Sequence, residues 1–95
     1  MKPYNVIRPA IRQDWASDPT DGLQLELSAE VGGMVHTLAA VVADGTDESL
    51  WFEVYVNGKA VQIPLAQVVS AINAAPGSVH SKRWLVAHAS TGVGT

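Results

Sequence analysis

The residues of this chain that could do chemistry are few, and none has the spacing of a known catalytic or metal-binding motif. The sequence contains three histidines and no cysteine, so a zinc site would have to combine imidazoles with carboxylates from distant segments. It has no His-x-x-x-His pattern and no glycine-rich phosphate loop, and Ser78 near His80 lacks the Gly-x-Ser-x-Gly elbow of hydrolases. We therefore predict no catalytic residue, no metal site and no cofactor, and expect the protein not to be an enzyme.

The carboxylates offer a second candidate chemistry. Asp44, Asp47 and Glu48 could bind a hard cation, but they lack the acidic ladder of a calcium loop, and a solvated polar loop is the alternative. All nine acidic residues precede Gly58, and no lysine or arginine lies among them. This segregation favours an acidic face that attracts a basic partner, unless alternating strands simply place the acids in water.

A short basic cluster lies between residues 80 and 88. Its imidazole and cationic groups make a candidate anion-binding site, comprising His80, Lys82, Arg83 and His88. Two permanent positive charges are too few for the electrostatic footprint of a nucleic-acid-binding protein, so we expect no nucleic-acid partner. Binding of a small anion or metabolite at this site, or a minor enzymatic activity there, is the alternative to the function developed below.

The first half of the chain is predicted to form strands. Tyr4 to Ile11 is assigned as an edge strand, and Asp18 to Gly22 has the residues of a turn. Leu23 to Val31 alternates apolar and polar residues, which predicts a strand with one dry face. Gly32-Gly33 favours a tight turn into Met34–Ala43. We predict this segment as a strand, with helix as the alternative because its alanines and apolar spacing also fit a helical stripe.

The run from Leu50 to Ala75 switches from a two-residue to a 3.6-residue apolar period at Pro64. A two-residue turn at Asn57-Gly58 pairs Val56 with Lys59 and, further along, Phe52 with Ile63. This register places four apolar side chains on one face, those of Phe52, Val54, Val61 and Ile63. After the proline, a helical apolar stripe is expected to cover that face, consisting of Leu65, Val68, Val69 and Ile72.

Together these elements predict one small α+β domain over residues 1–95. We expect an antiparallel sheet of about four to five strands with one amphipathic helix, about Pro64–Ala75, packed on one face. Trp84 and Val86 are assigned to a last strand or short turn, and the C-terminal tail from about residue 90 is expected to be flexible. No segment approaches the roughly 20 apolar residues that cross a bilayer, so we expect no membrane contact and a cytoplasmic location.

The hairpin also suggests a function. Its second face would carry exposed aromatic and polar side chains, a candidate partner-binding set of Trp51, Glu53, Tyr55 and Gln62. Large aromatic residues are enriched at the centres of protein interfaces. We therefore predict a protein-interaction module that binds another protein or itself, for example as a homodimer, with an acidic inhibitor or immunity-type protein as a narrower version. The alternative is that other strands cover these aromatics as ordinary core.

Overall fold

The computed structural model describes residues 5–20 and 22–92 of the chain. Within them, a five-stranded antiparallel sheet has the order β1-β2-β3-β4-β5, so each strand pairs with its neighbours in sequence. The strands are β1 (Arg12–Asp18), β2 (Gly22–Val31), β3 (Met34–Ala43), β4 (Leu50–Val56) and β5 (Lys59–Pro64). Helix α1 (Leu65–Ala74), the 3-10 turn η1 (Ala75–Gly77) and helix α2 (Lys82–Gly92) follow. The predicted α+β class is confirmed.

The turns form where the sequence predicts them. Gly32 and Gly33 both have positive φ, 62° and 82°, as a primed hairpin turn between β2 and β3 requires. Asn57 and Gly58 adopt the same left-handed region between β4 and β5, with φ of 50° and 74°. Met34–Ala43 is therefore a strand rather than a helix. Pro19 and Thr20 form the predicted turn before β2, whereas Asp21 lies outside the described residues.

The register of the β4–β5 hairpin is the predicted one. Val56 pairs with Lys59 and Phe52 with Ile63. Because directly paired residues project to the same side of a sheet, the pairing can be followed across all five strands. One such row consists of Trp15, Leu25, Val41, Phe52 and Ile63. We call the side that carries this row the apolar face.

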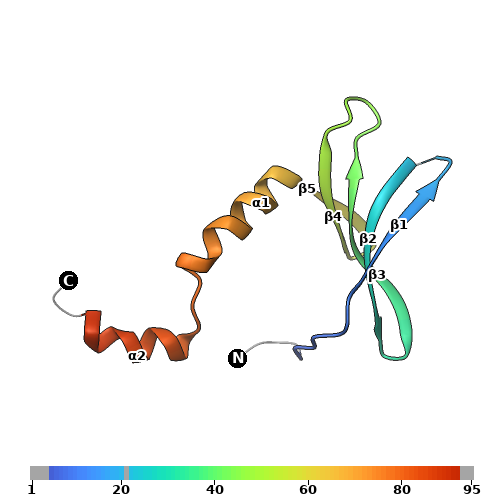
Figure 1. Ribbon diagram of the computed structural model, residues 1–95. Helices are drawn as coiled ribbons and strands as arrows, with labels where there is room; N and C mark the ends of the chain where they lie inside the picture. The colour runs from blue at the N-terminus through green and yellow to red at the C-terminus, as the bar shows by residue number, and fades with distance from the viewer. Residues whose placement is uncertain (1–4, 21, 93–95) are drawn as a thin grey trace.

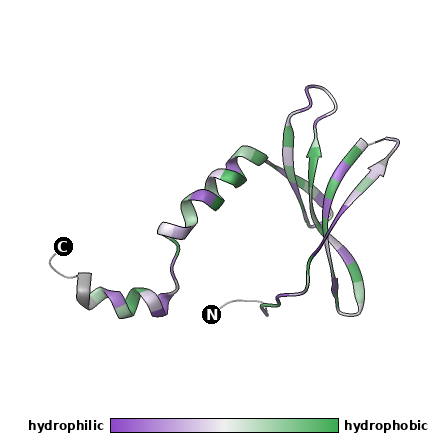
Figure 2. Cartoon of the chain, viewed as in Figure 1, coloured by the Kyte–Doolittle hydropathy of each residue, from purple (hydrophilic) through white to green (hydrophobic). Residues whose placement is uncertain are grey.

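The neighbouring row projects to the opposite side, because side chains alternate along each strand. It consists of Asp14, Glu26, Ala40, Glu53 and Gln62, and we call this side the polar face. The interleaving of hydrophobic and hydrophilic residues along the strands is visible in Figure 2. A bulge between Leu27 and Ser28 shifts the β2–β3 register by one residue, opposite Leu38.

Helix α1 packs against β4 and β5, as predicted, but only at one end of the sheet. Its first residue follows directly on Pro64, which closes β5 with φ −52° and ψ 130°. Leu65 and Val68 are half-buried, whereas Ile72 is 62% exposed. The second half of the predicted stripe therefore does not pack on the hairpin, and the first turns of α1 line a crevice with Leu50 and Trp51 at the start of β4. Figure 1 shows the helices leading away from the sheet.

The segment after η1 differs from the prediction. Trp84 and Val86 lie in helix α2, not in a last strand or short turn. Ser81 begins this helix, because its Oγ accepts a hydrogen bond from the backbone N–H of Trp84 at 3.1 Å, three residues later. The backbone of α2 continues to Gly92, so the tail predicted to be flexible from about residue 90 falls partly on residues 93–95, outside the described residues.

The N-terminal edge strand is also displaced. The sheet begins at Arg12, which pairs with Ser28, and residues 5–11 have no strand assignment, so the strand predicted from Tyr4 to Ile11 is wrong. Tyr4 itself lies outside the described residues. Pro9 lacks the N–H that a ladder needs, which favours a strand that starts only after it.

The chain is extended and its core is small. The Cα radius of gyration is 18.1 Å, whereas a compact domain of this length has about 12 Å. Among the described residues, the buried hydrophobic side chains are those of Ala29, Ala39 and Ala40. We refer to residues 65–92, which comprise α1, η1 and α2, as the arm.

Candidate functional site

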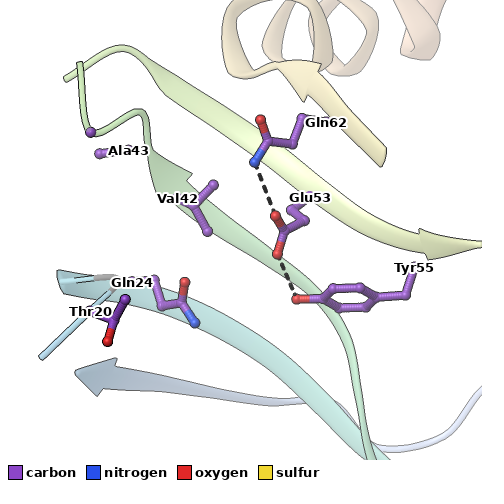
Figure 3. Close-up of a pocket in the computed structure, with 8 residues that line it drawn as sticks. Thr20, Gln24, Val42, Ala43, Glu53, Tyr55 and Gln62 are labelled. Atoms are coloured by element: carbon purple, nitrogen blue, oxygen red, sulfur yellow. Dashed lines mark hydrogen bonds between the residues drawn. The ribbon is translucent and has the colours of Figure 1, made fainter. Parts of the chain in front are cut away.

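The partner-binding residues predicted on β4 and β5 form a connected cluster on the polar face. Glu53 lies at its centre, where its Oε2 accepts a hydrogen bond from the Tyr55 hydroxyl at 2.9 Å and its Oε1 accepts one from Gln62 Nε2 at 3.0 Å. Figure 3 shows both bonds beside an open depression of about 450 Å³, which Gln24 and Val42 also line. The sequence predicts that Glu53, Tyr55 and Gln62 share a face, and the structure adds that Glu53 is hydrogen-bonded to the other two.

The acids Asp14, Glu26 and Glu53 occupy one row of the polar face, with the small side chain of Ala40 between the two glutamates. Three of the nine acids of the sequence thus lie in one row. Asp14 is paired with Arg12, with 3.4 Å between Oδ2 and Nη2, while Glu26 accepts a hydrogen bond from Gln24 Nε2 at 3.0 Å.

Tyr55 reports the electrostatics of this cluster. Desolvation, the hydrogen bond to Glu53 and the negative charges of Glu53 and Glu26 raise the pKa of the Tyr55 phenol from 10.0 to about 12. Each of these causes disfavours the phenolate, because it either removes water or places a negative charge near the oxygen. The phenol therefore stays protonated and donates to Glu53 across the physiological range.

Trp51, the fourth predicted residue, is held by a different set of bonds. Its indole Nε1 donates to Ser49 Oγ at 2.9 Å, and the Ser49 hydroxyl donates to Asp47 Oδ1 at 2.6 Å. The Ser49 side-chain and backbone hydrogen bonds lower the pKa of the Asp47 carboxyl. The indole, half-buried beside α1, is thereby fixed to the loop before β4 and does not join the Glu53 cluster.

The loop considered as a cation site satisfies its own backbone. Asp44 Oδ1 accepts the Thr46 N–H at 2.7 Å and Asp47 Oδ1 accepts the Ser49 N–H at 3.0 Å, so both carboxylates serve the turn. Glu48 adopts a positive φ of 61° in this loop. No cluster of three or more metal-ligating side chains occurs within residues 5–20 and 22–92.

The apolar face is open at its β1–β2 end. Trp15 is 71% exposed on β1 and Leu23 is 64% exposed on β2. Together with Leu25, Val41 and Leu50 they line a shallow hollow of about 230 Å³. A second apolar crevice, of about 570 Å³, lies between Trp51 and the first turns of α1.

The predicted anion-site residues all lie at or near α2, but they divide into two groups. His80, Trp84 and His88 stack in series, with ring centroids 3.6 Å and 3.8 Å apart and interplanar angles of 11° and 18°. The side chains recur every four residues, which places them on one side of the helix. Lys82 and Arg83 are exposed in the first turn.

Sequence reasoning missed two features that the structure adds. The stacked ladder was detectable from the spacing of His80, Trp84 and His88, and the helix from Ser81 as its N-terminal cap. The apolar row across all five strands was not detectable, because the first strand was predicted to end at Ile11, before Trp15. No helix within the described residues is long and apolar enough to cross a membrane.

No protein-family model matches this chain, and comparison with curated proteins and with solved structures finds no match. Its function is therefore inferred from the surfaces described above.

Proposed function

We propose that this protein is a non-enzymatic protein-interaction module that binds its partner through the apolar face. One observation carries the proposal. Apolar side chains of all five strands occupy this face, while the buried hydrophobic side chains of the described residues are three alanines. A fully buried aliphatic side chain contributes about 1.5 to 3 kcal/mol, a gain that the exposed and half-buried side chains of this face realise only in part. Contiguous apolar surface of this kind is typical of an interface.

The polar face supports this assignment by contrast. Its central side chains bond to one another, and its row contains three carboxylates, so it gains less from excluding water. The aromatic set predicted from the sequence, Trp51 and Tyr55 with Glu53 and Gln62, remains a competing interface on this side. The two faces are therefore distinguishable by experiment.

The test places the same photo-crosslinking amino acid, p-benzoylphenylalanine, on either face. Trp15 on the apolar face and Tyr55 on the polar face are both exposed aromatics, so each substitution conserves an aromatic side chain. In cells that naturally produce the protein, we expect protein adducts from position 15 and few from position 55. Adducts from position 55 alone would assign the interface to the polar face, and none from either position would refute the proposal.

The row of Asp14, Glu26 and Glu53 favours a second candidate, an inhibitor-type protein that covers a basic surface. Its association would weaken steeply with ionic strength, whereas binding through the apolar face would persist in high salt. Measuring the adduct yields from positions 15 and 55 in a lysate of those cells at low and high ionic strength separates the two candidates.

A further inference from the structure

We propose that the partner of the apolar face is the arm of a second copy of this chain, so that two copies exchange arms in a symmetric dimer. This inference rests on the proposed function and names its partner. The sheet leaves its apolar face exposed, and the arm leaves part of the apolar stripe of α1 exposed. Packing one of these surfaces on the other would remove both from water.

The exposed area supports a dimer of this size. The chain exposes 7986 Å², whereas a compact monomer of 10.0 kDa exposes about 5,200 Å². The excess of about 2,800 Å² per copy, or about 5,600 Å² for two copies, is at the upper end of what obligate dimers bury, which ranges from about 2,000 to more than 5,000 Å² for both copies together. A second copy that covered half of this excess would already provide a stable interface.

The connection between sheet and arm favours docking of the arm on the sheet of a second copy over docking on its own sheet. Strand β5 ends at Pro64 and α1 begins at Leu65, with no loop between them. A helix that turns back over its own sheet normally needs a connection of about 2 to 6 residues. Here α1 continues away from the sheet, and Val69 and Ile72 of its stripe are 47% and 62% exposed.

The charges of the sheet disfavour one alternative arrangement. Docking one polar face on another would bring the rows of Asp14, Glu26 and Glu53 together and is disfavoured by repulsion. Packing two apolar faces directly would bury the sheets but leave both α1 stripes in water. Exchange of arms covers both kinds of apolar surface.

The experiment measures the mass of the full chain by sedimentation equilibrium, with variants in the arm and in the sheet. We expect the wild type at about 20 kDa, twice the 10.0-kDa chain. The arm variant Val69→Lys with Ile72→Lys changes two side chains that are already exposed, and should weaken dimerisation at least about a hundred-fold. Its matched control, Gln67→Lys with Ser70→Lys on the opposite side of α1, should remain dimeric.

The sheet variant is Val61→Lys on the apolar face, with Gln62→Lys on the polar face as its control. Val61→Lys alone should also be monomeric. Mixing the arm variant with the sheet variant should restore a dimer, because the intact arm of one copy can still dock on the intact sheet of the other. Far-UV circular dichroism of each variant confirms that the sheet and helices are retained.

Three results would overturn arm exchange. A dimer that tolerates the arm variant but not Val61→Lys indicates face-to-face packing of sheets; the proposed function then stands while this inference fails. A monomer whose radius of gyration falls towards about 12 Å indicates that the arm closes on its own sheet, and then both fail. A monomer that keeps a radius near 18.1 Å excludes self-association and leaves the proposed function to a different protein.

Discussion

The sheet and the arm of this chain differ in how their backbone groups are hydrogen-bonded and in how much they pack against the rest of the molecule. In the sheet, five strands satisfy each other's backbone groups, and the hairpin turns supply the left-handed residues that the geometry needs. In the arm, each helix forms its own internal hydrogen bonds, but within the described residues α2 makes no extensive contact with the sheet and α1 contacts mainly β4 and β5. Both regions have regular secondary structure, and among the described residues neither buries a large side chain completely.

This difference separates hydrogen bonding from burial as sources of stability. A paired backbone avoids a penalty but contributes little net free energy, whereas ordering each residue costs about 1 to 2 kcal/mol of conformational entropy. Burial of apolar side chains must supply the rest of the free energy that offsets this entropy. In this chain, the apolar face and the α1 stripe would supply it only when a partner covers them. Stability of this chain should therefore depend on chain concentration, as it does for obligate dimers.

The largest difference in stability between the two regions is expected when a buried alanine of the sheet and an exposed alanine of the arm are replaced. Ala40 has no exposed surface and lies between Glu26 and Glu53 in its row, so Ala40→Glu would add a fourth carboxylate to that row at a packed position. We expect a loss of at least about 3 kcal/mol in the free energy of unfolding. Urea unfolding at a fixed chain concentration measures it. Ala71→Glu in the exposed part of α1 is the control, and an equal loss there would contradict the contrast.

A smaller effect is expected at the hairpin glycine. Gly58 has a φ of 74° and an added Cβ would meet no atom within 4 Å, so the cost of Gly58→Ala is purely one of backbone conformation. We expect it to lower the free energy of unfolding by about 1 to 2 kcal/mol. Gly77→Ala in η1 also meets open space, without a positive φ, and should be close to neutral in the same urea titration. Similar losses of unfolding free energy for the two variants would show that the positive φ of Gly58 is not the cause.

The N-terminal cap of α2 tests whether the arm is energetically independent. Ser81→Ala removes the bond to the Trp84 N–H and should destabilise the helix by about 1 kcal/mol. We expect faster amide hydrogen exchange in residues 82–92 without a change for β2 and β3. Ser78→Ala, before the helix, is the control. Faster exchange in the strands as well would show that sheet and arm unfold together.

The smallest effect concerns the pH dependence of the sheet. Because the pKa of Tyr55 rises from 10.0 to about 12, the folded state binds its proton more tightly than the unfolded state. The stabilisation is complete below pH 10 and is lost as the pH rises towards about 12. In a Tyr4→Phe background, absorbance at high pH should report this titration, and Glu53→Gln should lower the midpoint. A midpoint near 10 in both proteins would exclude the proposed coupling.

The sequence predicted those parts of the fold that depend on local rules. Asn57-Gly58 fixed the turn, and the cost of burying Glu53 fixed the register, so the division of β4 and β5 into two faces was predictable. The strand assignment of Met34–Ala43 followed from the glycine pair before it. The Glu53 cluster was predictable as a shared face, but not its hydrogen bonds, which depend on rotamers.

The remaining features depend on contacts between distant residues. Trp84 and Val86 alternate as in a strand, yet a cap at Ser81 and rings stacked four residues apart favour α2. The stripe of α1 was recognisable, but its period says nothing about which sheet it covers. β1 was misplaced because Trp15 joins the apolar row only through its pairing with Leu25.

The strand order has a kinetic consequence. Each strand pairs with the next along the chain, so the sheet needs only short loop closures and belongs to the topologies that fold fast. Single hairpins form in about 1 to 10 μs, far sooner than two dilute molecules collide. Sheet formation should then be first-order, while exchange of arms is a later, second-order step whose half-time shortens as the protein is concentrated.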